Sequence, residues 1–191
     1  MKATQNGESE MIKLHLGSAD TLLDGYVNCD MLDVSGAVVM DACDLSRFHN
    51  DTVDEILCHN LVEHLTYKQA ARAFSEWRRV LKPDGKLVIG CPDILVLCKR
   101  FVDGTENERW GGLPVGTEQV RFGYALIQGI YGGQFGNADP QIFGLGSIPQ
   151  LAMTHKSGWT PGYLINWLKL IGFKSFENRS GDAEVSVTAF K

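Results

Sequence analysis

One amphipathic helix flanked by two apolar runs constrains the fold of this chain more than any other feature. Apolar residues recur at helical spacing over 66–81, and Thr66 with Gln69 matches a capping box at the start of that stretch. The apolar, β-branched runs 53–58 and 86–91 stand before and after it. A strand–helix–strand unit of this kind makes its two strands parallel, with a right-handed crossover. The sequence therefore predicts an α/β fold.

Further strands and one more helix are predicted on either side of this unit. Short apolar runs that end at Gly, Asp or Asn predict strands, and Thr160-Pro161 predicts a helix start that Gly172 would stop. The two runs nearest the C-terminus are separated by Ser180-Gly181-Asp182, which predicts a terminal hairpin. The predicted strands outside the central unit are 12–16, 26–29, 37–40, 173–178 and 184–190.

The region from about 95 to 155 differs in composition from the rest of the chain. It holds 11 of the 21 glycines and many aromatic residues, and no long periodic helix covers it. We interpret it as an insertion into a single domain over 1–191, acting as a lid or a partner surface. Within it we predict His155 as a general base, or else as a loop cap. Tyr131 and Trp159 are candidate pocket walls, or else core residues.

Suitable ligand-binding groups follow four of the predicted strands. The carboxyl ends of strands in an open parallel sheet form the usual ligand site. In chain order these positions offer a glycine for close backbone approach, a carboxylate suited to a ribose diol, and a carboxylate with a backbone N–H suited to adenine. Two polar side chains follow, beside the expected amino-acid part of the ligand. The residues are Gly17, Asp30, Asp44 with Leu45, and His59 with Asn60.

The same segments resemble motifs of the class I S-adenosylmethionine-dependent methyltransferases. Residues 14–18 are similar to the glycine motif of that family, and 79–87 resembles its RVLKPGGxL segment. Residues 25–30 resemble the GWxNxD strand of small predicted methyltransferases often encoded beside glycan genes. The resemblance extends over nearly the whole chain, with further similar segments at 53–56, 61–65, 92–93, 131–134 and 155–159.

The resemblance implies both a detailed fold and a cofactor. The fold would be a Rossmann-like, doubly wound sheet of seven strands, mostly parallel with an antiparallel last strand. The reaction would transfer a methyl group from S-adenosylmethionine to an oxygen or nitrogen of a small molecule or glycan. The implied cofactor contacts are Gly17, Ser18, Asp30, Met31, Asp44, Leu45, His59 and Asn60.

Two departures from the family pattern leave a second hypothesis open. Ala19 stands where the family usually has a second glycine, and only 13 positions separate Gly17 from Asp30. The connecting helix is therefore expected to be very short or absent, which weighs against an NAD site because a pyrophosphate needs that helix N-terminus. The alternative to an enzyme is a degenerate binding module that recognises a partner through the 95–155 insertion.

Glu63 and His64 form a second candidate acid/base pair. The alternative is that they begin a helix, where a carboxylate is favoured by the helix dipole, and orient each other or a loop. His15 alternates with apolar neighbours and is expected to be structural. No spacing of His, Cys, Asp and Glu indicates a metal site, so none is predicted.

Charge and cysteine usage narrow the possible partners and the compartment. The net charge of −5 and the lack of a basic stripe argue against a nucleic-acid partner. Five basic residues between 72 and 86 are interpreted as a solvated helix face.

The five cysteines show no CxxC spacing, which indicates buried thiols in a reducing compartment. The apolar run 12–16 is too short for a signal or membrane helix, so a cytoplasmic location without membrane contact is expected. The oligomeric state stays open.

Overall fold

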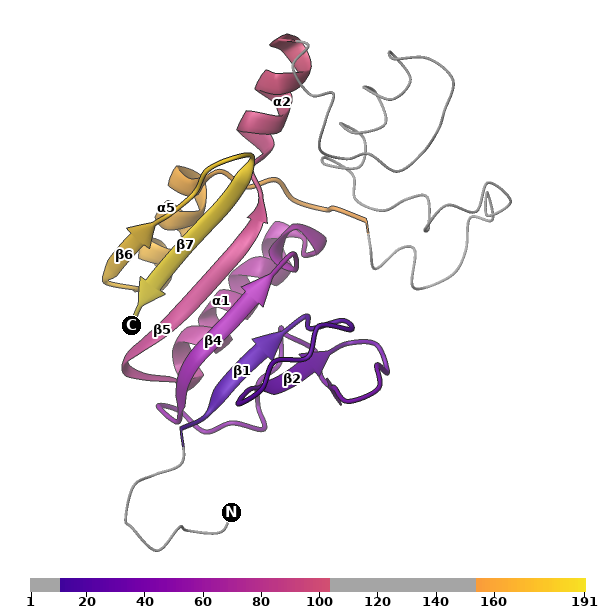
Figure 1. The fold of residues 1–191 in the computed structure, drawn as a ribbon. Helices are drawn as coiled ribbons and strands as arrows, with labels where there is room; N and C mark the ends of the chain where they lie inside the picture. The colour runs from indigo at the N-terminus through magenta and orange to yellow at the C-terminus, as the bar shows by residue number, and fades with distance from the viewer. Residues whose placement is uncertain (1–10, 104–153) are drawn as a thin grey trace, which may run out of the picture.

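The computed structural model describes residues 11–103 and 154–191, which form one mixed sheet with helices packed on it. The sheet has seven strands in the order β3-β2-β1-β4-β5-β7-β6. All pairs are parallel except the two that β7 makes, with β5 and with β6. The predicted Rossmann-like fold and its terminal hairpin are therefore confirmed (Figure 1). The strands are β1 Lys13–Leu16, β2 Val27–Asp30, β3 Val38–Val39, β4 Val53–His59, β5 Leu81–Pro92, β6 Ser175–Asn178 and β7 Glu184–Phe190.

The helix ends follow the capping signals of the sequence. Thr66 and Gln69 form the complete capping box that starts α1, and Thr160 accepts the N–H of Tyr163 at the start of α5. Gly172 ends α5 in the left-handed conformation, with φ of 106°. The helices are the 3₁₀ turn η1 Val62–His64, α1 Tyr67–Val80, α2 Ile94–Asp103 and α5 Pro161–Ile171.

The core lies between the sheet and the two helices α1 and α5, which share one face of the sheet (Figure 1). Alternate residues of the central strands are fully buried there, as the period of two in a strand requires. Aromatic rings from α1, from α5 and from the segment before α5 pack edge-to-face, stacked or tilted, which joins the two helices. These rings belong to Tyr67, Phe74, Trp77, Trp159, Tyr163 and Trp167.

Three elements differ from the sequence prediction. Strand β5 begins at Leu81 instead of Lys86, because Leu81 pairs with Val53 before a register shift at the predicted turn 83–85. Strand β3 has only two residues, both exposed, at the sheet edge. Helix α2 was not predicted, although Asp93 accepts the N–H groups of Leu95 and Val96 as an N-cap would.

The described residues bear on three further expectations: the burial of the cysteines, membrane-spanning helices and the insertion. Cys29, Cys43, Cys58 and Cys91 are buried free thiols as expected, whereas Cys98 is exposed. Within the described ranges no helix is long and apolar enough to span a membrane. Most of the 95–155 insertion, including Tyr131, lies outside the described residues.

Candidate functional site

The carboxyl ends of β1, β2 and β4 bring the predicted cofactor residues to one edge of the sheet (Figure 1). After β1 the chain turns at Gly17, whose φ is 71°, and the N–H groups of Gly17 and Ser18 both donate to the Cys29 carbonyl (2.9 and 3.0 Å). A Cβ on Gly17 would lie 3.1 Å from the Cβ of Leu61, so glycine is required for this packing. No helix forms over 17–26, as the short spacing predicts.

Asp30 ties this turn to the end of β2. Its carboxylate accepts the Ala19 N–H through Oδ2 and the Leu32 N–H through Oδ1, both at 2.9 Å. A carboxylate offers about four acceptor positions, so two remain for a ligand diol. Ala19 has φ of 43°, a conformation that favours glycine, and the turn therefore keeps its glycine-like shape at this departure from the family. Met31, which follows, is 61% exposed.

The loop after β3 carries Asp44 and Leu45, the residues predicted to contact adenine. Asp44 is exposed, and hydrogen bonds from Ser46 hold the pKa of its carboxyl below the usual value. Leu45 is fully buried, and its N–H already donates to Glu76 Oε2 at 3.3 Å. The adenine role of Asp44 stays a prediction, while the Leu45 N–H has a partner within the protein.

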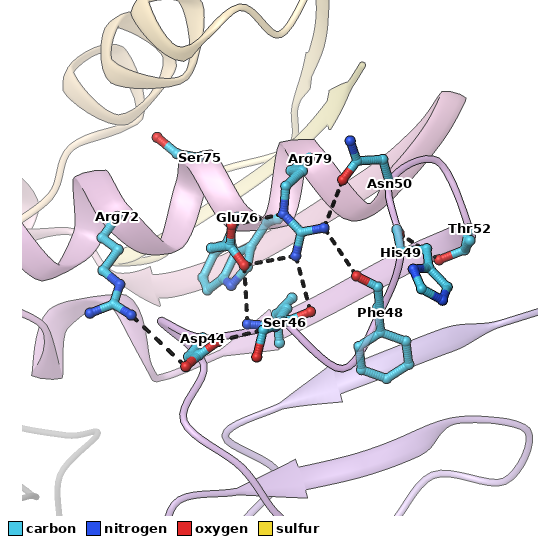
Figure 2. A network of polar contacts seen from close by, with 12 residues as sticks. Asp44, Ser46, Phe48, His49, Asn50, Thr52, Arg72, Ser75, Glu76 and Arg79 are labelled. Carbon is cyan, nitrogen blue, oxygen red and sulfur yellow. Dashed lines mark hydrogen bonds and ion pairs between the residues drawn. The ribbon is translucent and has the colours of Figure 1, made fainter.

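Figure 2 shows that Arg79 holds this loop against α1. Its guanidinium makes two hydrogen bonds of 2.8 Å to the Glu76 carboxylate and donates to the carbonyls of Leu45 (3.1 Å) and Phe48 (3.0 Å). A further bond of 2.8 Å reaches Asn50 Oδ1. All five guanidinium N–H groups thus have acceptors. The interpretation of the basic residues as a solvated face is wrong for Arg79.

We expect Arg79→Ala to destabilise the fold by about 2–3 kcal/mol and to weaken binding of S-adenosylhomocysteine. Hydrogen bonds to charged groups contribute roughly 1.5–3 kcal/mol each, and their loss would release the loop that carries Asp44. Arg72→Ala is the matched control, because Arg72 lies on the same helix and contacts only Asp44, at 4.0 Å, among the contacts described for it. Urea unfolding and calorimetry measure both effects. Equal effects of the two substitutions would contradict this role of Arg79.

His59 and Asn60 follow β4 at the same edge. The imidazole of His59 lies over Gly90, where an added Cβ would come within 3.0 Å of the ring. Asn60 has φ of 50°, and its N–H donates to the Gly90 carbonyl at 2.9 Å. Strained backbone of this kind is typical of functional sites. Both side chains stand where the sequence predicts a ligand, and their role in binding stays a prediction.

A buried polar cluster lies immediately beyond Leu61, which packs on Gly17. Glu63 and His64 belong to the 3₁₀ turn η1, and the return of the chain toward α5 brings His155 to them. His155 Nε2 lies 4.0 Å from Glu63 Oε1, and the two imidazole rings pack edge-to-face with centroids 4.9 Å apart. One ligand atom from each residue lies within 4.8 Å of the other two. The structure thus joins two candidates that the sequence analysis treated separately.

The segment that carries His155 is held to η1 by backbone hydrogen bonds. The N–H groups of Lys156 and Ser157 both donate to the Glu63 carbonyl, at 2.7 and 3.2 Å. The Trp159 indole N–H donates to Ser157 Oγ and to the Val62 carbonyl. Trp159 is fully buried, so its candidate role as a pocket wall is wrong, and it packs in the core instead.

Burial sets the electrostatics of the cluster. Desolvation raises the pKa of Glu63 to about 8 and lowers the pKa of His64 to about 4. Burial also raises the pKa of the Cys58 and Cys91 thiols well above the usual value, and the nearby Glu63 adds to both shifts. Perturbed groups of this kind at a ligand edge are typical of functional sites.

A separate cavity of about 320 Å³ contains none of the predicted site residues. It is lined by Asn50, Asp51, Ser75, Arg78, Arg79, Ile171 and Lys191. These residues lie in the C-terminal half of α1, at the end of α5, just before β4 and just after β7. The cavity therefore opens at the opposite edge of the sheet from the strand carboxyl ends.

Comparison with known proteins agrees with the fold described above. Residues 8–89 match the sequence profile of a family described as methyltransferase domain. An S-adenosylmethionine-dependent methyltransferase from Archaeoglobus fulgidus has a similar structure, with a TM-score of 0.56 and 14% identity over 95% of this chain and 86% of that one. The resemblance to class I methyltransferases is confirmed. No curated protein matches the chain in sequence.

Other methyltransferase structures share the fold at similarly low sequence identity. A possible histamine N-methyltransferase from Thermotoga maritima gives a TM-score of 0.55 at 14% identity, covering 96% of this chain and 84% of that one. The Burkholderia thailandensis 1,6-didemethyltoxoflavin-N1-methyltransferase was solved with bound 1,6-didemethyltoxoflavin and S-adenosylhomocysteine. It gives a TM-score of 0.54 at 12% identity, covering 94% of this chain and 70% of that one. Three further similar structures belong to longer chains, and this chain covers only 46%, 53% and 49% of their lengths. At these identities the likeness establishes the fold.

Proposed function

We propose that this chain transfers a methyl group from S-adenosylmethionine to an oxygen or nitrogen of a small-molecule or glycan acceptor. The observation that carries the proposal is the Gly17–Ala19 turn, tied to the Asp30 carboxylate at the ligand edge of a methyltransferase fold. The residues fit the cofactor: Gly17 keeps the turn free of a side chain, and the buried Ser18 hydroxyl has no hydrogen-bond partner within the described residues.

Each group at this edge has a distinct role in the proposed reaction. Bound S-adenosylmethionine supplies an electrophilic methyl carbon and the thioether leaving group. Asp30 binds the ribose diol with the acceptor positions that its backbone contacts leave free. Leu61 joins the cofactor turn to the cluster of Glu63, His64 and His155, which faces the acceptor and takes the proton that the acceptor loses. Positioning of two reactants supplies roughly 7–11 kcal/mol of barrier lowering in well-oriented systems.

We expect S-adenosylhomocysteine to stabilise the chain against thermal unfolding. A ligand at about 100 times its dissociation constant adds about 2.7 kcal/mol, which corresponds to a rise of roughly 5–10 °C in Tm for a chain of this size. Differential scanning calorimetry with S-adenosylmethionine, S-adenosylhomocysteine and adenosine triphosphate as the control measures this. The absence of a shift with either sulfur ligand would favour the binding module, for which the substitution at Ala19 is the supporting observation.

A further inference from the structure

The cluster of Glu63, His64 and His155 has the composition of a metal site. It offers one carboxylate and two imidazoles, from two segments far apart in the sequence, with ligand atoms all within 4.8 Å of one another. Ligand atoms about 2.1 Å from a tetrahedral metal ion lie about 3.4 Å apart. The distance of 4.0 Å between Glu63 Oε1 and His155 Nε2, and the 4.8 Å within which all three ligand atoms lie, are longer, so side-chain rotations would have to close the site around the ion.

A second, independent observation concerns an oxygen of the Glu63 carboxylate. Its side chain is buried, with the residue 3% exposed, and Oε2 has no hydrogen-bond partner within the described part of the chain. Buried carboxylate oxygens are normally paired with a donor, a cation or a metal ion. A carboxylate binds a metal ion through one or both of its oxygens, so Oε2 is available to an ion held between Glu63 and the two histidines.

The surroundings of His64 match those of a metal-binding histidine. Its Nδ1–H donates to the Thr154 carbonyl at 3.3 Å, which leaves the lone pair on Nε2 for coordination. Metal-binding histidines usually donate their other ring N–H to a carbonyl or carboxylate in this way. The backbone bonds from Lys156 and Ser157 to the Glu63 carbonyl fix the two ligand segments relative to each other.

We propose that Glu63, His64 and His155 bind a divalent transition metal ion of the zinc class. Two imidazoles with one carboxylate favour zinc, cobalt, iron or manganese, whereas magnesium and calcium take oxygen ligands. Three protein ligands leave a coordination position open, as in catalytic zinc sites. On the proposed function, the metal would replace direct proton transfer to the cluster. An acceptor hydroxyl in the open position would lose its proton to solvent more readily, because the bound cation stabilises the alkoxide.

The Lys156 ammonium, on the segment that carries His155, opposes a cation electrostatically. It acts on His64 electrostatically, but its side chain is exposed, so water and salt screen its charge. The metal would also have to reach a buried carboxylate. The first effect lowers the affinity and the second slows binding, and neither changes which residues bind the ion.

Cobalt titration of the full chain tests the site. The protein, untagged and carrying Cys98→Ser to remove the exposed thiol, is stripped with chelator and titrated with Co²⁺, followed by Zn²⁺ competition. We expect one equivalent of Co²⁺ with the visible absorption of a four- or five-coordinate ion, displaced by Zn²⁺ and unaffected by Mg²⁺. Glu63→Gln and His155→Ala should each weaken Zn²⁺ binding at least tenfold to a hundredfold. His49→Ala, at an exposed loop histidine, should leave it unchanged.

Three results would overturn the metal site: no Co²⁺ spectrum, equal affinity of wild type and the two ligand variants, or equal loss in His49→Ala. Circular dichroism of each variant establishes that it is folded. Calorimetry with S-adenosylhomocysteine on metal-free protein separates this proposal from the proposed function. Retained binding of S-adenosylhomocysteine without any metal binding would reject the metal site alone, whereas its loss would reject the methyltransferase proposal.

Discussion

His155→Ala is expected to lower methyl transfer about a hundredfold or more while leaving the affinity for S-adenosylhomocysteine within a factor of two. Proton removal by a positioned group typically raises the rate 10²–10⁴-fold. Truncation to alanine removes the imidazole that lies beside Glu63 in the cluster. The expectation holds whether His155 takes the proton directly or binds the proposed metal. Turnover with an identified acceptor, together with calorimetry, gives both quantities.

The control for this prediction is His49→Ala, which changes an exposed histidine of the loop after β3. Its turnover should equal that of the wild type. Turnover of His155→Ala near the wild-type value would show that His155 only caps the loop before α5, the alternative that the sequence leaves open.

Glu63→Gln is expected to stabilise the metal-free protein at pH 8 by an amount on the order of a few kcal/mol, and by little at pH 4 to 5. The folded-state pKa of Glu63 is about 8, above its ordinary value near 4.5. Between these values the folded state binds more protons than the unfolded state, so wild-type stability falls as pH rises from about 4.5 through about 8. The amide side chain of the Glu63→Gln variant does not ionise, so the stability of the variant does not fall in this way as the pH rises. His64, His155 and the Cys58 and Cys91 thiols face the carboxyl.

Glu55→Gln is the matched control for this pH dependence. Glu55 is similarly buried, at 7% exposure, but accepts the Tyr26 hydroxyl at 2.8 Å and lies near the ammonium groups of Lys13 and Lys86. Its neutralisation should therefore lower stability. Urea unfolding from pH 5 to 8 with chelator present measures both variants. A destabilised Glu63→Gln at pH 8 would contradict the proposed electrostatics of the cluster.

The sequence predicts the framework of the fold because its local signals agree with its tertiary structure. The capping box at Thr66, the Thr160-Pro161 start and the Gly172 stop each satisfy helix-end groups locally, and the structure has all three. The strand ends at Gly17 and Asp30 meet at one edge because parallel strands point the same way. The local sequence pattern and the common direction of the parallel strands were therefore sufficient to predict these helix ends and the position of these strand ends.

The parts that the sequence missed depend on contacts between distant residues. Arg79 has the spacing of an exposed helix position, and only the loop that folds back over α1 supplies its acceptors. Glu63 and His155 are separated by almost half of the chain, so no ligand spacing marks their cluster. The signal available for α2 was Asp93 after Pro92, an N-cap that the composition of the following segment obscured. Residues 104–153, which carry most of the predicted insertion, lie outside this comparison.

Titration calorimetry of S-adenosylhomocysteine into wild type, Asp30→Ala and Asp33→Ala tests the central claim most directly. Hydrogen bonds to a charged acceptor contribute roughly 1.5–3 kcal/mol, so Asp30→Ala should bind at least about tenfold more weakly while staying folded. Asp33, an exposed neighbour of the same loop, serves as the control and should leave the affinity unchanged. Saturable binding by the wild type that is lost only in Asp30→Ala is the predicted result. Absence of binding by the wild type, or equal affinities of all three proteins, would contradict a cofactor site at the end of β2.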